Sequence, residues 1–127
     1  MRVSDLVRNY IRTNVIPAYL PAVTWNEDQS PYDAENSKII FTKQTGRAVD
    51  AYVRQADVEI LLFSAKNANL TDLDSLLTEV ETVVEYIKAN FVITQYLRMS
   101  ITQDVTGPYN TSQNRYFYRI SVLTVSE

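Results

Sequence analysis

One long amphipathic segment dominates the pattern of hydrophobic and polar positions along the chain. Its apolar side chains recur at spacings of three and four residues: Leu73, Leu76, Leu77, Val80, Val83, Val84 and Ile87, with Phe91 in register just beyond. This spacing predicts a helix over residues 71–88 with a single apolar stripe. Thr71 is the expected N-cap, and Asp72 and Asp74 fall in the first turn, where the helix dipole favours an anion.

The polar face of this helix is acidic. Glu79, Glu81, Glu85 and Lys88 lie opposite the stripe, and we expect them to be solvated. Docking on a basic partner is the alternative. A helix with one apolar stripe buries it against another element, and a sheet face is the available partner.

On either side of this helix the hydrophobic period changes from 3.6 to 2, which predicts strands. Residues 38–42 and 51–64 precede the helix, and residues 95–103 and 115–125 follow it. The segment 51–64 has apolar residues on both faces at its end, which indicates a central strand or one covered by a partner molecule. Val58, Ile60 and Leu62 lie on one face, and Leu61 and Phe63 lie on the other.

The N-terminal region predicts a shorter helix followed by a loop. Ser4 is the expected N-cap of a helix over Asp5–Asn14, and Pro17 and Pro21 prevent its continuation. Residues 18–37 are expected to be loop-like, with residues 23–25 as the candidate for a short edge strand.

Two glycines mark the expected hairpin connections. Gly46 is expected to supply a positive φ after the first strand, and Gly107-Pro108 lies in a polar hairpin loop over residues 104–114. The order helix-β-β-α-β-β predicts an α+β fold. We expect an antiparallel sheet of four to five strands, with the long helix and the N-terminal helix packed on one face. Residues 1–127 are expected to form a single domain.

The composition of the chain excludes several classes of catalytic and ligand-binding site. The chain has no His and no Cys, which removes the commonest general base and metal ligand, together with thiolates and disulfides. Two glycines cannot build a phosphate-cradling loop. No run of about 18 apolar residues predicts a membrane span, and residues 1–10 do not resemble a signal peptide.

Paired carboxylates are the remaining candidates for catalytic groups. Asp72 and Asp74 would point to different sides of a helix and are better explained as partners of its dipole. Asp57 and Glu59 share a strand face, with Arg54 nearby, and are expected to form a solvated polar end. The expectation is therefore a protein that is not an enzyme and uses no metal or cofactor.

A binding module is the next class to weigh. Residues 116–119, Tyr-Phe-Tyr-Arg, are a weak match to a strand-borne stacking platform for nucleic acid. The net charge of −3 disfavours that reading, since nucleic-acid affinity needs a basic footprint. Nine tyrosines suit either strands or protein interfaces. A subunit of a larger assembly fits these features best.

The layout resembles the tail terminator family of long-tailed bacteriophages over roughly residues 3–125. Residues 39–46 resemble the family's first strand and polar turn, and residues 57–65 its second strand. Residues 73–87 resemble its long helix, and residues 106–119 its closing hairpin. Gly46 stands alone where relatives often have a glycine pair.

The resemblance implies a structural protein of the virion that is assembled in the host cytoplasm. It would form a ring, usually a hexamer, that caps the finished tail tube, ends polymerisation and presents a docking surface to the head connector. Its partners would be itself, the tail tube protein and the head-tail connector protein. DNA would cross an acidic channel without specific binding.

Two loops are the expected contact regions in such a ring, namely residues 44–50 and 106–115. The candidate contact residues are Gln44, Thr45, Gly46, Arg47, Asp50, Gly107, Tyr109 and Arg115. The alternative for both loops is an ordinary solvent-exposed turn. The alternatives for the whole protein are another head-tail connector, a tail tube subunit, or a small nucleic-acid- or ligand-binding module.

Overall fold

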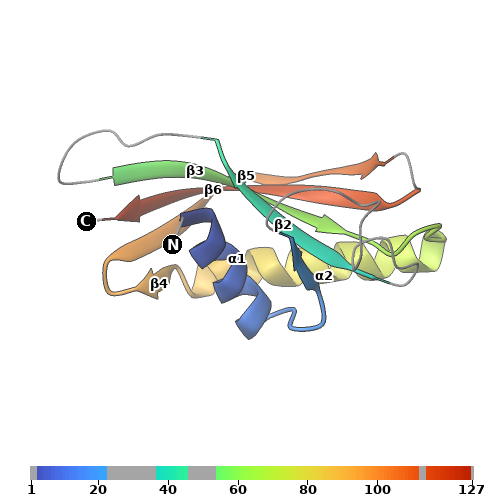
Figure 1. The fold of residues 1–127 in the computed structure, drawn as a ribbon, viewed down its shortest axis with the longest axis horizontal. Helices are drawn as coiled ribbons and strands as arrows, with labels where there is room; N and C mark the ends of the chain where they lie inside the picture. The colour runs from blue at the N-terminus through green and yellow to red at the C-terminus, as the bar shows by residue number, and fades with distance from the viewer. Residues whose placement is uncertain (1–2, 23–36, 46–53, 112–113, 127) are drawn as a thin grey trace.

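The computed structural model describes residues 3–22, 37–45, 54–111 and 114–126 (Figure 1). In chain order its elements are α1 (Val3–Asn14), β1 (Leu20–Ala22), β2 (Ile39–Gln44), β3 (Arg54–Phe63), α2 (Leu70–Ala89), β4 (Val92–Thr94), β5 (Leu97–Asn110) and β6 (Tyr116–Ser126). The fold is α+β, as the hydrophobic period predicts.

The strands form one sheet in the order β1-β2-β3-β6-β5-β4. All neighbours are antiparallel except β1 and β2, which are parallel. The prediction of four to five antiparallel strands therefore missed β1, in a region expected to be a loop, and the short β4. Pro21 cannot donate to a ladder, but β1 is an edge strand, where proline is tolerated. The expected strand at residues 23–25 lies outside the described residues.

Both helices lie on the same side of the sheet (Figure 1). The main core is built from Val7 and Ile11 of α1, the stripe of α2, and the sheet side chains that face them. On β3 these are Val58, Ile60 and Leu62, all fully buried. The predicted central position of this strand is confirmed, since β3 lies between β2 and β6.

The start of α2 differs from the prediction. Asn69, not Thr71, is the N-cap, and its side chain accepts a hydrogen bond of 2.9 Å from the Asp72 amide. The Asp72 carboxylate in turn accepts one of 3.1 Å from the Asn69 amide, which completes a capping box. Similarly, Ser4 is a buried residue inside α1 and not its cap.

The acidic face of α2 is only partly solvated. Glu81 and Glu85 are exposed as expected. The Glu79 carboxylate instead accepts hydrogen bonds from the Tyr19 hydroxyl and from Lys38 Nζ, the latter at 2.9 Å. Glu79 therefore connects α2 to the residues that precede β1 and β2, the two strands at one edge of the sheet. Phe91 does not extend the stripe, because it lies past the helix end and is half exposed.

The expected hairpin loop over residues 104–114 is mostly strand. β5 continues to Asn110, with register shifts after Ile101, Gln103 and Thr106. Such irregularities absorb a glycine and a proline inside a strand that would otherwise stop there. None of the helices in the described ranges is long and apolar enough to span a membrane.

Candidate functional site

The sheet face turned away from both helices, here called the outer face, carries the most distinctive side-chain arrangement. Side chains alternate along a strand, so residues between core positions project to the opposite face. The ladder aligns Leu61 with Arg119 and Phe63 with Phe117, and it aligns Phe117 with Tyr109 of β5. Three strands therefore bring aromatic and charged groups together on this face.

Three aromatic rings form a row across the strands. The ring centroids of Phe63 and Phe117 are 4.8 Å apart, and those of Phe117 and Tyr109 are 5.2 Å apart. Both pairs are tilted and fall in the separation range of favourable aromatic contacts. Phe63 is buried at one end of the row, whereas Tyr109 is 41% exposed at the other. Tyr109 is therefore the ring that a partner can reach.

Charged side chains border this row. The Glu59 carboxylate lies 3.4 Å from Lys43 Nζ and 3.7 Å from Arg119 Nη1. Arg119 also donates from Nε to Thr106 Oγ1 at 3.3 Å, and its guanidinium lies 5.9 Å from the Tyr109 ring centroid. These groups and the adjacent apolar side chains enclose a hollow of about 270 Å³.

The first predicted contact loop is only partly described. Gln44 ends β2, and Thr45 extends the hairpin, because its amide donates to the Asp57 carbonyl at 2.7 Å. Gly46, Arg47 and Asp50 lie outside the described residues, as does the expected positive φ of Gly46.

The second predicted loop contributes Gly107 and Tyr109, but as strand residues. Gly107 has a φ of +129°, and a Cβ there would lie 3.0 Å from the Phe117 carbonyl oxygen and 3.1 Å from the Tyr118 ring. Only glycine fits this conformation and this close approach without strain. Gly107 thus shapes β5 so that Tyr109 meets Phe117.

Arg115 does not belong to an exposed contact loop, and that prediction is wrong. The side chain is fully buried. Its Nη1 donates to the carbonyls of Ser37 at 2.5 Å and Ser64 at 2.7 Å. A guanidinium can satisfy several carbonyls at once, which explains its place inside the fold. Arg115 holds the structure together and is not available to a partner.

The predicted stacking platform is divided between two faces. Tyr118 is buried against the helices and Tyr116 packs at the edge of the same core. Only Phe117 and Arg119 reach the outer face, where Tyr109 joins them. Consecutive aromatic residues on one strand cannot form a continuous platform, because alternate residues point in opposite directions.

The carboxylates predicted to share a strand face do lie on the outer face. Asp57 and Glu59 share it, as predicted, but Glu59 is held between two cations rather than at a solvated strand end. In the described ranges no three His, Cys, Asp or Glu side chains gather as a metal site. Burial and a hydrogen bond from its hydroxyl to Glu79 raise the pKa of Tyr19, so its phenol stays protonated.

Sequence reasoning missed Lys43 as a member of this surface, and it placed Arg119 in a stacking platform for nucleic acid, not beside Glu59. The predicted strand 38–42 stopped one residue before Lys43, and the meeting of the two cations at Glu59 depends on β3 lying between β2 and β6. Comparison of the chain with protein-family models and with curated proteins finds no match.

Proposed function

We propose that this protein is a tail terminator of a long-tailed bacteriophage. It forms a ring of identical subunits on the finished tail tube, ends tube polymerisation, and provides the docking surface for the head connector. The proposal rests on the resemblance in layout, which places a strand pair, a long helix and a final strand pair in the same order. It is supported by surfaces on this chain that suit subunit contacts.

The observation that carries the proposal is the open edge of β5. β4 covers this edge only at Leu97 and Arg98, and the Phe91 carbonyl accepts a hydrogen bond from the Met99 amide. From Ser100 to Asn110, no described strand pairs with the outward side of β5. Proteins normally shorten or cover such an edge, because its unpaired backbone groups invite pairing with another chain.

The irregularities of β5 limit what can pair there. Its three register shifts and Pro108 interrupt the edge, which disfavours indiscriminate pairing. A ring of identical subunits needs a specific heterologous contact that closes on itself. An interrupted edge that accepts one partner in one register suits that requirement better than a regular edge would.

The outer face supplies a second contact surface. Tyr109 and Arg119 are of the residue types enriched where proteins meet, and here they lie together beside a hollow lined by both charged and apolar side chains. This surface favours a docking role toward the tube or the connector. The same features would suit a tube subunit, so the experiment must separate a protein that stops growth from one that polymerises.

The test mixes the purified protein with tail tube subunits of the same phage and images the product by negative-stain electron microscopy. Shortened tubes with a ring at one end are expected. Tubes of unchanged length with bare ends would contradict the proposal. Filaments formed by the protein alone would identify a tube subunit instead.

A matched pair of variants links the activity to the outer face. Tyr109→Ser removes the exposed ring of the aromatic row, whereas Tyr96→Ser removes a ring that is 60% exposed in the turn before β5. We expect Tyr109→Ser to lose tube capping and Tyr96→Ser to retain it, with unchanged circular dichroism in both. Equal capping by both variants would remove the outer face from the proposal.

A further inference from the structure

The beginning of α2 presents an apolar side chain to solvent. Leu70, its first residue, is 80% exposed, more than any other large apolar side chain in the described ranges. Asp74 lies one turn further along the same side of the helix. A single exposed leucine carries no inference alone. Here it combines with a complementary hollow at the opposite end of the same helix.

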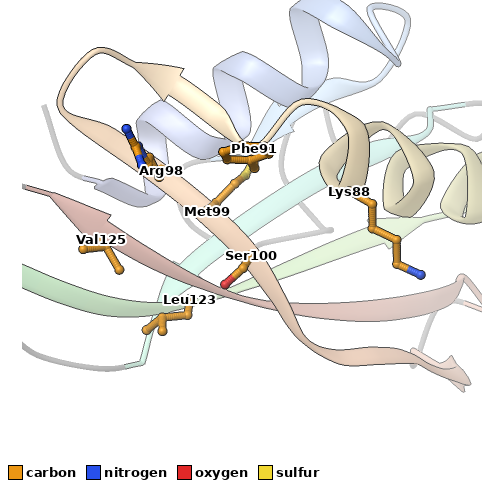
Figure 2. Close-up of a pocket in the computed structure, with 7 residues that line it drawn as sticks. All are labelled: Lys88, Phe91, Arg98, Met99, Ser100, Leu123 and Val125. Carbon is orange, nitrogen blue, oxygen red and sulfur yellow. The ribbon is translucent and has the colours of Figure 1, made fainter.

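This hollow, here called the β5 pocket, wraps around β5 just past the end of α2 (Figure 2). Its volume is about 390 Å³, and its apolar lining is Phe91, Met99, Leu123 and Val125. The open side of this lining faces solvent, since Phe91 is half exposed. The pocket therefore has room for an apolar side chain and its neighbours.

Two cations border the β5 pocket. Lys88 comes from the last turn of α2 and Arg98 from β5. Lys88 makes only a 3.9 Å contact with the exposed Glu85, and no ion pair joins Arg98 to a carboxylate among the described residues. An occupant with an apolar group beside a negative charge would complement both the lining and the rim.

We propose that the occupant is a second copy of this chain, whose Leu70 enters the β5 pocket while its Asp74 faces Lys88 and Arg98. Leu70 and Lys88 are 18 residues apart on one helix, or about 27 Å, so a molecule cannot fill its own pocket. The contact joins two different patches and is heterologous, which builds a closed ring or a filament. It rests on the proposed function only for its role as the ring contact.

Cysteine crosslinking tests this contact directly, because the chain has no natural cysteine. Leu70→Cys is mixed with Ser100→Cys, whose exposed side chain lies on the pocket wall, and the mixture is oxidised with and without tail tubes. We expect a disulfide-linked dimer from the mixture and a ladder of oligomers from the double variant. Thr82→Cys, exposed near the middle of α2, replaces Leu70→Cys in the control and should crosslink at least tenfold less.

A charge exchange tests the rim. With the cysteine pair in place, Asp74→Lys or Arg98→Glu alone should reduce the crosslinked yield by about tenfold, and the two exchanged together should restore it. Restoration is a result that damage to folding cannot produce.

The outcomes separate this contact from the terminator role. No crosslinking beyond the control, with or without tubes, overturns the contact, and the same follows if Leu70→Cys alone forms most of the dimer. Wild-type capping of tubes would leave the terminator proposal standing in either case. Efficient crosslinking by a protein that leaves tube ends bare would establish the contact and reject the terminator.

Discussion

Replacing Arg115 by alanine should destabilise the protein more than any surface substitution. The buried Arg115 side chain donates to the carbonyl that follows the undescribed segment 23–36, at Ser37, and to the carbonyl that follows β3, at Ser64. It therefore joins three parts of the chain at the point where β6 begins. Alanine removes both hydrogen bonds, of which the one to Ser64 is buried and the one to Ser37 is partly buried.

The expected magnitude follows from these two hydrogen bonds. A hydrogen bond to a charged group contributes about 1.5–3 kcal/mol, so the pair contributes about 3–6 kcal/mol. The cost of desolvating the guanidinium, and water entering the space it leaves, reduce the net loss. We expect a decrease of about 3 kcal/mol in the free energy of unfolding, a large part of the 5–15 kcal/mol that is typical of a folded protein.

Urea denaturation followed by far-ultraviolet circular dichroism measures this loss. Arg98→Ala is the matched control, because Arg98 is exposed, and its effect should stay within about 0.5 kcal/mol. Arg115→Lys keeps the charge but not the planar fork and should fall between wild type and alanine. A loss below about 1 kcal/mol for Arg115→Ala would refute the claim that this side chain holds the three segments together.

Three further predictions concern other parts of the fold. Asn69→Ala removes the cap of α2 and should lower the free energy of unfolding in urea by about 1 kcal/mol; an unchanged value would argue against the capping box. Gly107→Ala should cost about 1–3 kcal/mol in the same assay, because φ is positive and the new methyl group meets the Phe117 carbonyl, whereas Ser100→Ala should be nearly neutral. Burial and the hydrogen bond to Glu79 raise the pKa of Tyr19 above its ordinary value of about 10, so the folded state holds this proton more tightly. The resulting stability is fully present below about pH 10 and is lost as the pH rises further, and Tyr19→Phe should flatten that decline in alkaline unfolding curves; an equally steep decline would contradict it.

Periodicity predicted most of the contact between α2 and the sheet, but it wrongly included Phe91 and missed Tyr19 and Ala22. The apolar spacing of α2 and the alternation in β3 and β6 identified the side chains that meet between helix and sheet. Such spacing carries this information because a helix or a strand buries one face. The start of α2 was harder to predict, because Asn69 and Thr71 are both suitable N-cap residues. The capping box that Asn69 forms with Asp72 decides between them.

The side chains of the outer face were harder to predict from the sequence than the core. Tyr109 was a predicted contact residue and does lie exposed on the outer face, but it was expected in a loop. Gly107-Pro108 is a typical turn signal, and nothing local indicates that a bulged strand accommodates it. Arg115 was assigned to the surface because it ends the expected contact loop 106–115, whereas the carbonyls that it binds belong to residues 51 and 78 positions earlier in the chain.

The position of β6 has a consequence for how the protein is made. β6 pairs with β3 on one side and with β5 on the other, yet it follows both in the chain. Until residues 116–126 leave the ribosome, the sheet exists only as two separate groups of strands, β1-β2-β3 and β4-β5. Each group then has a bare edge that could pair with another nascent chain. Slow translation of the codons for residues 116–126 would prolong this interval, so the yield of folded protein should depend on how quickly those residues are added.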